Sequence, residues 1–225
     1  MLNRAAKQAN SRQVQSNQRH LHPNLYKIVD RHLNTHYRAT VAGHNLRAYH
    51  RLQEQALCDG RPLILDSFCG TGRSTQLLAT RFPEHFVVGI DRSAHRLSKH
   101  GPVQLDNYLL LRAECEPVWQ LLAENQIRLS HHYLLYPNPW PKSGHLQRRI
   151  HGHANFPQLL ALGGKLELRS NWQIYVEEFG AAMHHAGQRG VVARLGENEH
   201  PLTLFEKKYR DSGHPIWSYR CLIAP

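Results

Sequence analysis

The sequence lacks the features that mark secreted, membrane-spanning or zinc-binding proteins. It has only four cysteines and no CxxC pair, so neither a zinc site nor a disulfide framework is predicted. It has no run of about 18 apolar residues, and its polar N-terminal stretch has no signal-peptide hydrophobic segment. We therefore expect a soluble protein of a reducing compartment, the cytoplasm, with neither a membrane nor a metal ion as partner.

Acidic residues are also scarce, with 17 Asp and Glu against 28 Lys and Arg, which gives a net charge of +11. The imbalance is greatest in residues 1–50, which hold eight Lys or Arg and a single acid, Asp30. Such a basic segment is either a solubilising tail or an electrostatic contact for a polyanion. The strongly basic balance favours a nucleic acid as partner.

The first 60 residues differ in pattern from the rest. Residues 1–19 are polar and nearly free of core-forming side chains, which predicts that they are disordered or become ordered only on binding. From residue 24 to about 57, apolar residues recur at helical spacing. This spacing predicts two helices, divided near Ala42 and Gly43, that lie against the main domain. We thus divide the chain into a basic N-terminal arm and helical extension (1–60) and a main domain (61–225).

Short apolar runs alternate with helix-length segments from residue 61 onward. The runs are 63–68, 86–90, 108–111, 133–136 and 165–168, and the helical segments are about 73–82, 93–100, 116–126, 146–162 and 172–187. This alternation predicts an α/β fold with a doubly wound, mostly parallel sheet. Two final strands, 191–195 and 216–223, bring the sheet to seven strands, and we expect a long polar loop rather than a helix between them.

A Gly-x-Gly turn follows the first predicted strand. Gly70 and Gly72 allow a left-handed backbone and close approach of a ligand. The third glycine of a dinucleotide-binding G-x-G-x-x-G is Thr75 here, and no Gly-Lys-Ser/Thr follows, so neither that motif nor a P-loop is favoured. Asp66, just before the turn, suits the ammonium of an amino-acid group better than it suits a pyrophosphate.

Two further acids follow the next two strands. Asp91 lies 19 residues beyond Gly72, where a carboxylate accepts hydrogen bonds from both hydroxyls of a ribose. Glu114 ends the third strand, and we expect it near an adenine amino group. Each acid alone is more often a helix cap or a solvated loop residue, but three acids at successive strand ends beside a Gly-x-Gly turn favour a nucleoside-containing ligand.

This combination resembles the class I S-adenosylmethionine-dependent methyltransferases, with Phe68 where many members have glycine. The resemblance implies a Rossmann-like fold and S-adenosylmethionine as the cofactor. It implies a cofactor-binding set of Asp66, Gly70, Gly72, Asp91, Glu114 and Asn138.

A proline-rich stretch follows the fourth strand, with the sequence YPNPWPKSGHLQRR from Tyr136 to Arg149. Three prolines in five positions exclude both a helix and a central strand. The stretch is therefore either a surface loop or a rigid turn at the carboxyl end of a parallel strand, where open α/β sheets build their sites. Its position after the three acids favours the second interpretation.

Residues 137–149 resemble the signature Pro-[acid]-Pro-Trp-x-Lys-x-x-His-x-x-Arg-Arg of the tRNA (guanine-N7-)-methyltransferases. Residues 170–175 resemble the family's T-D-W-x-x-Y, and residues 203–208 with 213–217 resemble its C-terminal T-x-[FY]-E-x-K…G-x-x-[IV]-[WY]. The resemblance covers about residues 61–223. It implies methyl transfer to N7 of a guanine in tRNA, by a monomer or a homodimer.

The resemblance also implies roles for individual residues. The family's acids at two positions are replaced here by Asn138 and Asn171. We expect the basic N-terminal arm and residues 142–149 to contact tRNA. The implied catalytic residues are Asn138, His145 and Arg148, and the implied substrate contacts are Lys142, Asn171, Thr203 and Glu206.

Guanine N7 has a lone pair and no proton, so methylation needs positioning and electrostatics rather than a general base. Asn138 keeps the shape of the family's acid but lacks its charge, a loss worth about 100–1,000-fold in rate. Two alternatives stay open. Asn138-Pro139-Trp140 also resembles the N-P-P-[FYW] loop of amino-group methyltransferases, which act on N6 of adenine or N2 of guanine, and the two asparagines also fit a catalytically weak RNA-binding paralogue.

Overall fold

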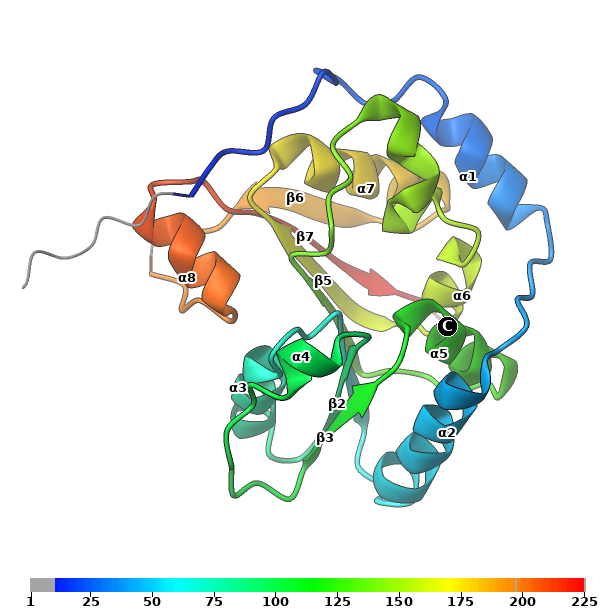
Figure 1. Ribbon diagram of the computed structural model, residues 1–225. Helices are drawn as coiled ribbons and strands as arrows, with labels where there is room; N and C mark the ends of the chain where they lie inside the picture. Colours follow the sequence, from blue (N-terminus) through cyan, green and yellow to red (C-terminus); the bar gives the residue numbers. More distant parts are fainter. Residues whose placement is uncertain (1–10, 197, 225) are drawn as a thin grey trace, which may run out of the picture.

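The computed structural model describes residues 11–196 and 198–224. Seven strands form one sheet in the order β3-β2-β1-β4-β5-β7-β6 (Figure 1). Strands β1 to β5 are parallel, and β7 runs antiparallel between β5 and β6. The predicted α/β fold with a mostly parallel seven-stranded sheet is confirmed. The strands are β1 (Leu63–Ser67), β2 (Phe86–Asp91), β3 (Tyr108–Arg112), β4 (His131–Leu135), β5 (Gly164–Ser170), β6 (Gly190–Arg194) and β7 (Trp217–Ile223).

Helices connect the parallel strands and also precede them. No helix within the described residues is long and apolar enough to cross a membrane. The α-helices are α1 (Leu25–Leu33), α2 (Gly43–Leu52), α3 (Arg73–Arg81), α4 (Ala94–Leu97), α5 (Cys115–Glu124), α6 (Phe156–Ala161), α7 (Gln173–His185) and α8 (Leu204–Asp211). A π-helical turn, Gln53–Leu57, extends α2, and two 3₁₀ turns, Ser143–Arg148 and Ile150–Gly152, follow β4.

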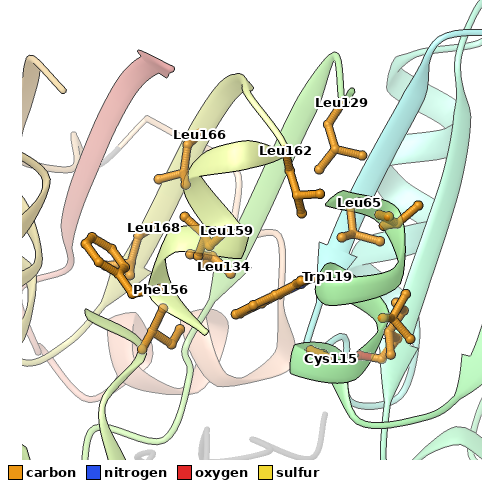
Figure 2. Close-up of a cluster of buried hydrophobic side chains, with 14 of the residues drawn as sticks. Leu65, Cys115, Trp119, Leu129, Leu134, Phe156, Leu159, Leu162, Leu166 and Leu168 are labelled. Atoms are coloured by element: carbon orange, nitrogen blue, oxygen red, sulfur yellow. Dashed lines mark hydrogen bonds between the residues drawn. The ribbon is translucent and has the colours of Figure 1, made fainter. Parts of the chain in front are cut away.

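The sheet divides its core into two layers. On one face, α1, α2, α5, α6 and α7 cover the large apolar cluster, and the side chains labelled in Figure 2 fill the space between the sheet and the helices α5 and α6. On the other face, Leu78 of α3 packs on Ile64 and Val87. Strands β1 and β2 are buried along their whole length, which explains their continuous apolar runs.

The chain reverses its direction of travel across the sheet between β1 and β4. It builds β1, β2 and β3 outward in one direction and then returns to place β4 on the other side of β1. Connections on the two sides of this point diverge and leave a crevice at the carboxyl ends of the strands. The Gly-x-Gly turn after β1 and the proline-rich loop after β4 both begin at this crevice.

The N-terminal extension packs against the main domain, as predicted. Helix α1 contacts α6 and α7, and α2 contacts α5 and β3. The prediction of disorder for residues 1–19 is wrong for residues 11–19, because Gln18 is buried and Ser11 and Ser16 are hydrogen-bonded to the main domain. Residues 1–10 lie outside the described residues.

The single helix expected at 146–162 is also wrong. The chain forms the two 3₁₀ turns and then α6 instead. Gly152 packs so closely on the preceding turn that a Cβ there would lie 2.1 Å from the carbonyl oxygen of Leu146. Pro157 lies in the first turn of α6. The backbone N–H groups of a first turn have no partner within the helix, so a proline, which has no N–H, is tolerated there and favours the start of a new helix.

The polar loop expected between β6 and β7 contains a helix, α8. Its N-cap is Thr203, whose side chain accepts a hydrogen bond from the backbone N–H of Glu206. Thr203 and Glu206 have the spacing of a capping box, a sequence signal for the start of a helix. The predominantly polar composition of the segment concealed this signal.

Two leucines on the paired strands β5 and β7 provide a test of the core. Leu168 is fully buried, whereas Leu222 is 65% exposed. We expect Leu168→Ala to lower the free energy of unfolding by about 2–5 kcal/mol and Leu222→Ala to change it by less than about 0.5 kcal/mol. Urea titrations of both variants measure the difference, and equal losses would contradict the assigned faces of these strands.

Candidate active site

The turn between β1 and α3 has three residues in the left-handed region: Phe68 (φ 63°), Gly70 (φ 63°) and Gly72 (φ 76°). Gly72 is the N-cap of α3, and a Cβ there would lie 2.6 Å from Leu110. Phe68 adopts a backbone conformation that costs a non-glycine residue about 1–2 kcal/mol. Its N–H donates to Cys115 Sγ (3.3 Å) and its ring packs edge-on against Trp119, so these contacts help to hold the turn.

Asp91 closes this turn from the end of β2. Its Oδ2 accepts a hydrogen bond from the N–H of Gly70 (3.0 Å), and its Oδ1 accepts one from the N–H of Ser93 (2.7 Å). Arg96 Nη2 lies 3.1 Å from the same Oδ1. The carboxylate is therefore fixed beside the Gly-x-Gly turn, and Arg96 is the cation next to it.

Asp66 is fully buried beneath the turn and does not line the cavity described below. Its Oδ2 accepts hydrogen bonds from the hydroxyls of Ser74 and Thr75, both at 2.7 Å. Burial raises the pKa of Asp66 to about 6, against the effect of these hydrogen bonds. The carboxylate thus anchors the first turn of α3, and a direct contact with a cofactor stays a prediction.

Glu114, at the start of α5, is held by the N-terminal extension. Its Oε2 lies 2.6 Å from Nε2 of His44, and its backbone N–H donates to Asn45. Burial raises the pKa of Glu114, but the hydrogen bonds from His44 and Asn45 outweigh it, so the pKa is lowered overall. Helix α2 therefore helps to position the third of the predicted acids.

The proline-rich loop after β4 has two bulky residues in the left-handed region, Tyr136 (φ 56°) and Trp140 (φ 45°). Asn138 is exposed between them, and its Oδ1 accepts a weak hydrogen bond from the N–H of Trp140 (3.4 Å). The guanidinium of Arg148 lies 4.9 Å from the indole centroid of Trp140, and His145 approaches the same ring edge-on. Such strained backbones persist only where neighbouring groups hold them.

Arg149 holds this loop from inside the protein. Its guanidinium is fully buried and donates to the carbonyl oxygen of Trp140 (3.1 and 3.2 Å) and to that of Lys142 (3.4 Å). It also pairs with the buried carboxylate of Glu178 on α7. Burial alone would raise the pKa of Glu178, but His151 and Arg149 lower it to about 2.

Helix α8 carries the C-terminal motif. Thr203 caps it, whereas Glu206 is fully buried and does not line the cavity. Both oxygens of Glu206 accept hydrogen bonds from Arg169 of β5 (3.0 and 3.2 Å), and Arg210 lies 3.1 Å away. The structure therefore shows Glu206 joining α8 to the sheet, and its expected contact with substrate stays a prediction.

The Gly-x-Gly turn after β1, the proline-rich loop after β4 and helix α8 surround one cavity of about 700 Å³ at the carboxyl ends of β1 and β4. Of the residues predicted from sequence, the cavity brings together Gly70, Asp91, Glu114, Asn138, Arg148 and Thr203. It is not lined by Asp66, Gly72, Lys142, His145, Asn171 or Glu206. Asn171 instead lies beside His214, with 3.5 Å between Nδ2 and Nδ1.

Sequence reasoning missed most of the positive charge of the cavity. Besides Arg148, five cations line it: Arg73, Arg92, Arg96, Lys99 and Lys208. Phe205, half exposed on α8, also lines it. No motif marks Arg73, Arg92, Arg96 or Lys99, which come from α3, α4 and the loops beside α4. Phe205 and Lys208 match the C-terminal motif at 203–208, but the resemblance implied no role for them, and only the capping box at Thr203 could have placed them in a helix.

The cavity suits a nucleoside that carries an amino-acid group. Its volume lies in the usual range for small-molecule sites. A Cβ at Gly70 would meet nothing within 4 Å, so a ligand has room to approach that backbone. Asp91 offers a fixed carboxylate for ribose hydroxyls. Arg96 is paired with this carboxylate in the structure, so its side chain would have to move when a ribose binds. Among the described residues, no group of three or more His, Cys, Asp or Glu could hold a metal ion.

A sequence model of the family described as "Putative methyltransferase" matches residues 60–219. A tRNA (guanine-N(7)-)-methyltransferase from Hydrogenovibrio crunogenus is 30% identical in an alignment that covers 69% of this chain and 70% of that protein. The enzyme of that name from Nitrosococcus oceani is 29% identical over 70% of each chain. The chain belongs to the tRNA (guanine-N(7)-)-methyltransferase family.

Solved structures support the methyltransferase fold. The 16S rRNA methyltransferase KamB is similar with a TM-score of 0.55 and 18% identity, over 79% of this chain and 93% of that one. The aminoglycoside resistance methyltransferase NpmB1 is similar with a TM-score of 0.53 and 19% identity, over 85% and 97% of the two chains. Both similarities confirm the predicted Rossmann-like class I methyltransferase fold.

The buried carboxyl of Asp66 predicts a specific pH dependence. Its pKa of about 6 exceeds the value of 3.8 in an unfolded chain, so the folded state binds its proton more tightly. Its contribution to stability is complete below pH 4 and is lost as the pH rises through 6, a change of about 3 kcal/mol. Asp66→Asn does not titrate, so its free energy of unfolding relative to the wild type should increase from pH 4 to pH 7.

Urea unfolding at several pH values measures this difference. Asp106→Asn, at a side chain that is 89% exposed, is the matched control and should follow the wild-type curve. Parallel curves for Asp66→Asn and the wild type would contradict the assigned titration.

Proposed function

We propose that this protein transfers a methyl group from S-adenosylmethionine to N7 of a guanine in tRNA. One observation carries the proposal: in a chain of this family, a single cavity joins the Asp91 and Gly70 turn to the loop of Asn138 and Arg148. The first group of residues suits the nucleoside of a methyl donor, and the second suits a nucleic acid. Donor and acceptor would thus meet in one cavity.

The residues at the carboxyl ends of β1, β2 and β3 would hold the donor. Asp91 would accept hydrogen bonds from the ribose, Glu114 would lie on the adenine side, and Gly70 leaves room for the backbone to approach. Asp66 would act from below by fixing α3 through Ser74 and Thr75. When bound, S-adenosylmethionine supplies an activated methyl group on a sulfonium.

The protein's own part in the reaction is orientation and electrostatics. Guanine N7 has a free lone pair, so no side chain has to remove a proton before attack. Burial and the neighbouring cations Arg148 and Lys142 lower the pKa of His145, which favours its neutral form. The side chain of Asn138, exposed in the cavity, offers an amide that can pair with the O6 and N1–H of a guanine.

Positive charge surrounds the cavity and continues onto the N-terminal extension. Arg31 of α1 donates to Gln147, which lines the cavity. Lys142 and Arg148 are exposed on the proline-rich loop and the turn after it. We assign the contacts with tRNA phosphates to these residues and to the basic N-terminal arm, where neutralised phosphates release counterions. A tRNA substrate would place the enzyme in the cytoplasm.

We further take residues 61–225 as the catalytic domain and residues 1–60 as its extension. The match of the family's sequence model to residues 60–219 supports this division. The extension still contributes to the cavity, since α2 holds Glu114 through His44. The boundary thus separates two parts of one site.

The direct test uses unmodified tRNA and radiolabelled S-adenosylmethionine. We expect label in tRNA and 7-methylguanosine after digestion to nucleosides. Absence of 7-methylguanosine at micromolar enzyme would contradict the proposal. Binding of tRNA without calorimetric affinity for S-adenosylmethionine would instead support an RNA-binding paralogue that has lost turnover.

A second candidate function is favoured by Asn138, which lines the cavity where the family's acid stands. An asparagine side chain can accept a hydrogen bond from an exocyclic amine. Methylation would then fall on N6 of adenine or N2 of guanine. The same nucleoside analysis distinguishes these products from 7-methylguanosine.

Restoring the acid should strengthen the proposed reaction. We expect Asn138→Asp to raise kcat by about 100-fold, because a carboxylate stabilises both the sulfonium and the methylated base. Asn125→Asp is the matched control, since Asn125 is exposed and does not line the cavity. A kcat for Asn138→Asp that equals or falls below the wild-type value would show that this chain uses the amide itself.

A further inference from the structure

We propose that residues 11–18 form a clasp that holds two walls of the cavity in place, helix α8 and the proline-rich loop, on the side where the methyl acceptor would bind. Gln18 would be a positioning residue for methyl transfer. This inference rests on the proposed function for its kinetic consequence, but its structural part can be measured without any activity. In Figure 1 the dark blue segment runs from the end of α8 across to α1. The N-terminal clasp, residues 11–18, lies in this segment.

The first end of the clasp is tied to the turn after α8. The N–H of Ser11 donates to Oγ of Ser212 (3.1 Å), and the carbonyl oxygen of Ser11 lies 2.9 Å from Nε2 of His214. The ring of His214 stacks on Tyr209 of α8. Helix α8 supplies Leu204, Phe205 and Lys208 to the cavity, so this end of the clasp supports the wall made by α8.

The other end is tied to the proline-rich loop. Oγ of Ser16 donates to the carbonyl oxygen of Pro141 (2.5 Å). Two residues later, the side chain of Gln18 is buried. Its Oε1 accepts a hydrogen bond from Nη2 of Arg149 (3.0 Å), and its Nε2 donates to Oε2 of Glu178 (2.6 Å). One amide thus bridges the buried ion pair that holds the loop.

The bridge matters because both charged partners are removed from water. Arg149 and Glu178 have fully buried side chains. A buried guanidinium needs an acceptor for its N–H groups, and a buried carboxylate needs donors for its oxygens. Without the amide of Gln18, Nη2 of Arg149 would depend on the two loop carbonyl oxygens alone. The loop would then become more mobile, while the protein as a whole would stay folded.

Loss of that position reaches the cavity through Trp140. The carbonyl oxygen of Trp140 accepts two hydrogen bonds from Arg149, and its backbone is held at φ 45°. Trp140, its neighbour Asn138 and its stacked partner Arg148 all line the cavity. The clasp makes no hydrogen bond with Gly70, Asp91 or Glu114 within the described residues, so binding of the methyl donor should not depend on it.

The decisive variant is Gln18→Leu, which keeps the volume but removes the amide. Gln15→Leu is its matched control, because Gln15 belongs to the same clasp, is exposed and makes no hydrogen bond among the described residues. For Gln18→Leu we expect kcat on tRNA to fall by about 10–100-fold, as for a misplaced acceptor. The Kd for S-adenosylmethionine should stay within about twofold of the wild type.

Hydrogen exchange gives the readout that is independent of activity. Amide protection of residues 137–149 should fall in Gln18→Leu and not in Gln15→Leu. Ser16→Ala, which loses one hydrogen bond, should give a smaller fall in the same peptide and serves if Gln18→Leu does not fold.

Unchanged protection of residues 137–149 in Gln18→Leu and Ser16→Ala would overturn the clasp. So would an equal loss of affinity for S-adenosylmethionine and of kcat, which indicates general unfolding. If the wild type makes no 7-methylguanosine, the proposed function fails, while the exchange data still decide whether the clasp exists.

Discussion

Arg149 and Glu178 form an ion pair with no exposure to water at the point where four segments of the chain meet. The pair joins the segment before α1, the proline-rich loop, the 3₁₀ turn that contains His151, and α7. Burying two charges is tolerated only when every remaining donor and acceptor is satisfied. The side chains and carbonyl oxygens around the pair meet this demand, and in doing so they fix where the loop can lie.

The cavity that results is positively charged on balance. Six Lys or Arg side chains line it, against the acids Asp91, Glu114 and Glu116. A methylated guanine carries a positive charge, and position 138 offers an amide in place of a carboxylate. In the proposed reaction, the phosphates of the substrate would bring negative charge into the site. Substrate binding and charge balance would then depend on the same cations.

The sequence predicted the parts of the fold that follow from periodicity and the parts of the site that follow from motifs. The strands were found because apolar runs at 63–68 and 86–90 are unambiguous. Local patterns could not show that Asp66 and Glu206 face inward, because a buried carboxylate and a cavity carboxylate look the same in a sequence. They also could not show that residues 11–19 are ordered. Polar side chains in this segment, such as Gln18, are buried because they bind partners more than 130 positions away in the sequence.

Strand β7 lies between β5 and β6, although it follows both in the chain. During synthesis, β6 therefore emerges before β7, the strand that it pairs with in the sheet. Until residues 217–223 have left the ribosome, Val191 and its neighbours have no hydrogen-bonded position next to β5. The sheet is completed only when this late segment inserts between β5 and β6, so β6, which precedes β7 in the chain, would be among the last strands to join it.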